Sequence, residues 1–179
     1  MDTGEPLTRW TVRVAVALYA ASLASRRYSP RWSRLAWTGG CLAYLLHVAA
    51  AFHYYHHWSH TDAYASTARQ TAEVVGIDWG GGLYVNYAFT LVWLADVFWW
   101  WMHPEPFARG ESVVRWIVHA FLGFVVFNAT VVFATGFSRW FGLGACVLLI
   151  VILFLPKKEC RHVDANDHGP TGLDGGDDR

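Results

Sequence analysis

Residues 83–102 read LYVNYAFTLVWLADVFWWWM, a run of twenty residues with a single charged side chain. A helix needs about 20 residues to cross the hydrocarbon core of a bilayer, so this stretch predicts a membrane-spanning helix. Residues 115–136, RWIVHAFLGFVVFNATVVFATG, give the same prediction. Neither stretch has the broad polar face that a surface helix of a soluble domain shows.

The composition of the whole chain agrees with this reading. Hydrophobic residues make up 54% of the 179 residues and charged residues only 16%, and the charges gather in short loops between apolar runs. Soluble domains reach only about 45–50% even when glycine is counted. We therefore predict an all-α integral membrane protein, a bundle of about five transmembrane helices with a short helix in an outer loop. The lipid bilayer is its first expected partner.

Five apolar runs are candidates for the spans, within one domain that covers residues 1–161. They are residues 8–25, 35–57, 83–102, 115–137 and 140–155. Arg9 and Arg13 lie in the opening turns of the first run, so a four-span arrangement with the N-terminus inside stays open. Residues 162–179 are rich in Gly and Asp, and we expect them to form a disordered cytoplasmic tail.

The basic residues orient the predicted spans. Cytoplasmic loops of membrane proteins carry an excess of Lys and Arg. Nine basic residues fall on one side of a five-span arrangement, namely Arg26, Arg27, Arg31, Arg34, Arg109, Arg115, Lys157, Lys158 and Arg161. We therefore expect a protein of the inner or plasma membrane with its N-terminus outside and its C-terminus in the cytoplasm.

A histidine-rich stretch, HYYHHWSHTD at residues 53–62, follows the second run on the predicted outer side. His53, His56, His57 and His60 have i, i+3, i+4, i+7 spacing, which predicts that they share one face of a helix. Imidazoles at that spacing can bind Zn, Cu or Fe, and Asp62 is the nearest carboxylate that could complete the site. The pattern thus predicts a transition-metal site. A pH-responsive site and a merely interfacial cluster remain as alternatives.

The five residues His53-Tyr54-Tyr55-His56-His57 resemble one HxxHH box of the membrane di-iron desaturases and hydroxylases. That family carries three such boxes on the cytosolic side. This chain has one, on the predicted outer side, so no function is carried over.

The loop after the histidines predicts a short helix over residues 63–75, with Asp62 as its N-cap and Gly76 as its stop. Its small and polar residues are unsuited to a span. It would lie across the outer mouth of the bundle as a lid, or form part of an ordinary exposed loop.

Four polar residues lie inside the apolar runs, where they are costly and usually face the bundle interior. They are His47, Asp96, His119 and Asn128. Counting about 1.5 Å per residue pairs Asp96 with His119 and His47 with Asn128 by depth. They act either as hydrogen bonds between helices or as a proton relay across the membrane. Haem is disfavoured, because His47 and His119 differ in depth by about 12 Å.

Three functions follow from these patterns. The first is a membrane metalloenzyme, the second is a small metal or proton transporter, and the third is a non-catalytic subunit or scaffold. A scaffold would bind a membrane protein partner or a second copy of the chain. No nucleic-acid-binding or nucleotide-binding motif occurs in the sequence.

Overall fold

The computed structural model describes residues 4–26, 28–103, 113–133 and 136–154, and every regular element in these ranges is helical. The predicted all-α class is therefore confirmed for these residues. The elements are α1 (Gly4–Ser25), α2 (Pro30–Tyr55), α3 (His60–Val75), α4 (Gly82–Met102), α6 (Val113–Phe127), the π-helical turn η1 (Asn128–Val132) and α7 (Phe137–Phe154).

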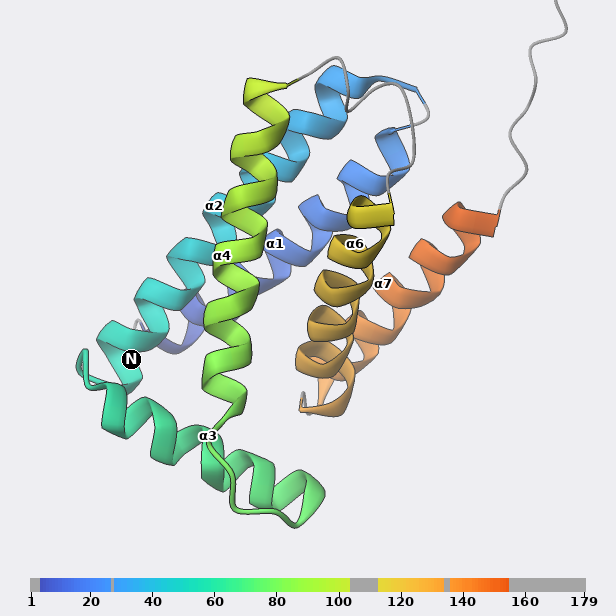
Figure 1. The fold of residues 1–179 in the computed structure, drawn as a ribbon. Helices are drawn as coiled ribbons and strands as arrows, with labels where there is room; N and C mark the ends of the chain where they lie inside the picture. The colour runs from blue at the N-terminus through green and yellow to red at the C-terminus, as the bar shows by residue number, and fades with distance from the viewer. Residues whose placement is uncertain (1–3, 27, 104–112, 134–135, 155–179) are drawn as a thin grey trace, which may run out of the picture.

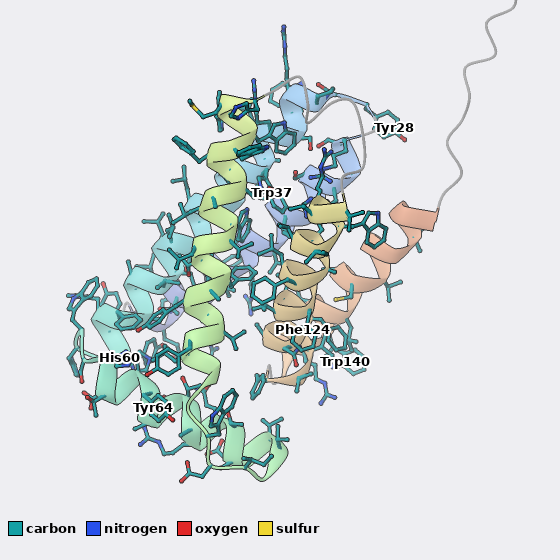
Figure 2. All side chains as sticks on the ribbon, in the orientation of Figure 1. Tyr28, Trp37, His60, Tyr64, Phe124 and Trp140 are labelled. Atoms are coloured by element: carbon teal, nitrogen blue, oxygen red, sulfur yellow. The ribbon has the colours of Figure 1, made fainter. Side chains whose placement is uncertain are left out.

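The long helices run alongside one another, and α3 lies across one end of them (Figure 1). We call this end the α3 end. The opposite end, where α1 turns into α2 at the exposed Tyr28, is called the Tyr28 end (Figure 2). Helix α4 contacts α2, α3 and α6, and α7 contacts α1 and η1. The predicted tail, residues 162–179, lies outside the described residues.

The pair α1 and α2 forms the most extensive helix contact of the bundle. Small residues let the two backbones approach, since a Cβ on Gly40 would lie 3.4 Å from the Ala15 carbonyl oxygen. Near the Tyr28 end, two fully buried serines bond reciprocally. Ser22 Oγ donates to the Ser33 carbonyl at 2.9 Å, and Ser33 Oγ donates to the Ser22 carbonyl at 2.8 Å.

Aromatic side chains form the core between the helices. Trp37 of α2 is fully buried and contacts Tyr19 of α1 and Trp93 of α4, with ring centroids 5.2 and 5.3 Å apart. Phe89 and Leu122 are also buried in this cluster. Large aromatic rings bury much area at tilted and edge-on angles, which suits a bundle with few aliphatic core residues.

Large apolar side chains also cover the outside of the long helices. Leu42, Leu46, Leu91, Phe98 and Ile117 are each more than half exposed. Among the described residues, two helical segments, Pro30–Tyr55 and Val113–Val132, are long and apolar enough to cross a membrane. The second contains the π-helical turn, so the predicted span 115–137 is not one regular α-helix.

Helix α3 is the predicted outer-loop helix, with a corrected start. Its N-cap is Ser59, whose Oγ accepts a hydrogen bond from the Asp62 backbone N–H, so Asp62 lies in the first turn instead of capping it. A serine there satisfies an N–H that has no partner within the helix. The predicted stop is confirmed, because Gly76 ends the helix with φ of 78°.

Candidate functional site

A cavity of about 290 Å³ lies among α1, α2, α3, α4 and the α6–η1 segment. Two histidines of α2 and the turn after it, His47 and His56, are among its lining residues. Helix α3, which lies across the end of the long helices (Figure 1), contributes the polar residues Ser66, Thr67 and Gln70 to the lining. This volume is near the lower limit of small-molecule sites, which suits a ligand the size of one ring.

Aromatic rings form much of the cavity wall. Tyr44 stacks on Trp93 with centroids 5.8 Å apart, and Phe52 stacks on Tyr87 at 6.5 Å. Thr90 and Asn86, which carry a hydroxyl and an amide group, are also among the lining residues. Sequence reasoning missed these residues because each belongs to an ordinary apolar run, and only the packing of α2 against α4 brings them together.

The four histidines of residues 53–60 do not share a helix face. Helix α2 ends at Tyr55, and His57 and Trp58 take positive φ angles of 47° and 60°. The Trp58 N–H donates to the Phe52 carbonyl, and the Ser59 N–H donates to the His56 carbonyl, which closes a tight turn. The i, i+3, i+4, i+7 argument required a continuous helix, and left-handed residues other than glycine are hard to foresee from sequence.

The histidines consequently have separate surroundings. His53 packs on Tyr54, and His56 packs on Phe52 while lining the cavity. The ring of His60 stacks near Tyr87, and its Nδ1 lies 3.1 Å from the Tyr87 hydroxyl (Figure 2). His57 and Asp62 are exposed. Within the described ranges, no three His, Cys, Asp or Glu residues are placed to hold a metal ion.

Burial at the cavity edge lowers the pKa of His56 below its ordinary value of 6.5. The carboxylate of Asp62 acts in the opposite direction, and the positive charges of Arg69 and His57 add to the lowering. His56 is therefore neutral near pH 7 and can accept a proton or a hydrogen bond at the cavity mouth.

The predicted pairing of His47 with Asn128 is wrong. His47 Nδ1 lies 2.9 Å from the Thr8 carbonyl oxygen, so α2 is bonded to α1 at this depth. Asn128 donates instead to the Phe124 carbonyl four residues earlier in its own helix, at 2.8 Å. Pairing residues by their depth in the spans could not identify these partners, because every residue has a backbone carbonyl and the sequence does not indicate which one accepts.

The predicted pairing of Asp96 with His119 is also wrong. At the Tyr28 end, the Arg26 guanidinium lies 2.7 Å from His119 Nε2 and over the rings of Trp37 and Trp100. Asp96 is half-buried and interacts electrostatically with Arg26 and the Trp37 N–H, although its Oδ2 completes no standard hydrogen bond among the described residues. Arg26 follows directly after the last residue of α1, so the sequence predicted a solvent-exposed arginine in a loop. The structure instead points its side chain into the bundle.

No family model matches the chain, and no curated protein or solved structure matches it either.

Proposed function

We propose that the chain is a five-span integral membrane protein that binds a small uncharged molecule in the cavity beneath α3. The spans are α1, α2, α4, the α6–η1 segment and α7. The exposed leucine, phenylalanine and isoleucine side chains on the outside of these helices support this placement, because soluble proteins rarely expose large continuous apolar surfaces. In a bilayer, the acyl chains of the lipids would cover these apolar surfaces.

The proposed orientation puts the α3 end outside and the Tyr28 end in the cytoplasm. The exposed Arg31 and the half-buried Arg34 lie near the Tyr28 end, and the Arg34 guanidinium is 4.2 Å from the centre of the Trp101 ring. Trp101 and Trp99 are also exposed there, as is typical of aromatic belts at a membrane surface. Arg109, Lys157, Lys158 and Arg161, which also entered the topology prediction, lie outside the described residues.

The cavity is the observation that carries the proposed binding function. It is bounded by α1, α2, α4 and the α6–η1 segment, has both aromatic and hydroxyl-bearing walls, and is covered by α3, which is itself unsuited to a span. Concave sites with mostly apolar walls and a few convergent polar groups are where small ligands bind.

A cavity-filling substitution tests the binding function. In protein reconstituted into nanodiscs, we expect Ala51→Phe to abolish binding of the uncharged probe 4-fluoroanisole, observed by ¹⁹F NMR, because Ala51 lines the cavity. Ala49→Phe is the matched control, since Ala49 is on the same helix but exposed. Equal binding to the parent, both variants and empty nanodiscs would refute the cavity as a ligand site.

The metal site at His53, His56, His57, His60 and Asp62 stays a prediction. Of these residues, only His56 is among those that line the cavity, so a metal would require the turn at residues 56–59 to rearrange. Elemental analysis after zinc, copper and iron loading, compared with a His56→Ala, His60→Ala double variant, decides it. Metal in the parent that is lost in the double variant would support the site, and affinity would fall below about pH 6.5 as imidazoles protonate.

The packing favours a closed cavity over a transport path. Tyr19 and Trp93 line the cavity and contact Trp37, and the Trp37 ring is 5.1 Å from that of His119. A proton relay from His47 to His119 would need to cross this layer of rings, which offers few groups that exchange protons.

A further inference from the structure

The cavity lining is uncharged. No Asp, Glu, Lys or Arg is among the described residues that line it. Of these lining residues, only His47 and His56 have side chains whose ordinary pKa is near neutral pH. An isolated charge is costly to bury without a partner of opposite sign. The occupant is therefore a neutral molecule.

The walls select a planar shape. Two stacked aromatic pairs, Tyr44 with Trp93 and Phe52 with Tyr87, lie on the cavity surface with interplanar angles of 29° and 27°. Flat rings pack against such faces in offset or edge-on arrangements that add to the area they bury. A single substituted ring fits the cavity volume of about 290 Å³.

His47 supplies the polar selectivity. A carbonyl oxygen can only accept, so the 2.9 Å contact with Thr8 places the imidazole hydrogen on Nδ1. In the neutral ring, Nε2 then carries a lone pair and accepts hydrogen bonds. Among the described residues, no protein group donates to this nitrogen. Because His47 is among the residues that line the cavity, a ligand there with a hydrogen-bond donor could satisfy this acceptor.

We infer that the ligand of the cavity is a neutral ring compound with a hydroxyl group, of the phenol or quinol class, whose hydroxyl donates to His47 Nε2. The inference rests on the proposed binding function and names the chemistry of its ligand. A hydroxyl is the simplest neutral donor on a planar ring, and a lipid-soluble phenol or quinol can reach a cavity in the membrane.

A matched pair of probes tests this assignment through the hydroxyl alone. In nanodiscs followed by ¹⁹F NMR, the parent should bind 4-fluorophenol roughly 3- to 10-fold more tightly than 4-fluoroanisole, the range expected for one net hydrogen bond. In His47→Phe, which keeps a ring but loses the acceptor, the two probes should bind alike. Empty nanodiscs correct for partition into lipid, and Ala51→Phe corrects for binding elsewhere on the protein.

Each outcome has a separate meaning. Equal affinity of the parent for both probes, with binding lost in Ala51→Phe, would overturn the hydroxyl assignment and leave the binding function standing. No binding of either probe would overturn both. Tighter binding of 4-fluorobenzoate or 4-fluorophenyltrimethylammonium would overturn the neutral class. If His47→Phe does not fold, His47→Leu replaces it, since it also lacks an acceptor and should lose the preference for the phenol. His47→Gln, whose amide can accept through oxygen, should keep that preference.

Discussion

At the scale of single residues, the reciprocal hydrogen bonds between Ser22 and Ser33 join α1 to α2. Each Ser→Ala change should destabilise the bundle by about 0.5–1 kcal/mol, and the double variant should cost less than the sum because the two Oγ atoms also contact each other at 3.2 Å. Unfolding in a titration with denaturing detergent measures this. Ser25→Ala is the control, because Ser25 bonds only to carbonyls of its own helix. If the two single changes lowered the free energy of unfolding additively, the two hydroxyls would not be coupled.

His56 gives the turn between α2 and α3 a dependence on pH. Its pKa is lowered in the folded turn, so the opened turn binds the proton more readily, and the turn loses stability as pH falls below about 6.5. We expect the amides of residues 57–59 to exchange faster at pH 5.5 than at pH 7.5, after correction for intrinsic rates. The dependence should vanish in His56→Gln and persist in His53→Gln. If the pH dependence of exchange persisted in His56→Gln, another titratable group would be its cause.

The sequence identified the polar residues inside the spans but not their partners. His47 contacts α1 and His119 contacts Arg26, so both side chains point toward other parts of the bundle, as predicted. Their partners are the Thr8 carbonyl and Arg26, which no pattern of side-chain spacing indicates. The prediction that the four histidines share one helix face was wrong for a related reason, because it required α2 to continue beyond Tyr55.

At the scale of elements, α3 depends on Gly76. Its φ of 78° is favourable only for glycine, and no atom lies within 4 Å of the position a Cβ would take. Gly76→Ala should therefore cost about 1–2 kcal/mol through the backbone alone. Amides in the last turn of α3 should exchange roughly tenfold faster by hydrogen–deuterium exchange. Gly144→Ala, equally uncrowded but inside α7, should leave α3 exchange unchanged. An unchanged rate in Gly76→Ala would show that this cap does not hold the helix.

Helix positions were more predictable than helix ends. The predicted runs 83–102 and 140–155 differ from α4 and α7 by at most a few residues, since long apolar stretches dictate where helices form. The ends depend on hydrogen bonds at single caps, as Ser59 shows for α3. The π-helical turn Asn128–Val132 was not foreseen, because nothing in an apolar run distinguishes a bond to the fourth preceding residue from one to the fifth.

At the scale of the whole molecule, the proposed orientation places Tyr28 and Asp78 on opposite sides of the membrane. In a variant without native cysteines, an impermeant thiol reagent added to intact cells should label Asp78→Cys and spare Tyr28→Cys. Both side chains are exposed, so accessibility within the protein does not decide the result. After the membrane is permeabilised, both should react. Labelling of Tyr28→Cys alone in intact cells would reverse the orientation, and equal labelling would contradict a spanning α2.

The serine pair also bears on how the chain is made. Only eleven positions separate Ser22 from Ser33, so the contact between α1 and α2 can form soon after synthesis has passed the first turn of α2. Insertion of α1 into a bilayer on its own would be unfavourable, because Arg9 and Arg13 lie among its apolar residues. The translocation machinery would instead receive a preformed hairpin in which α2 supplies the apolar surface. Under the proposed topology, biogenesis of the bundle would then begin with a pair of helices, and α1 would enter the membrane only together with α2.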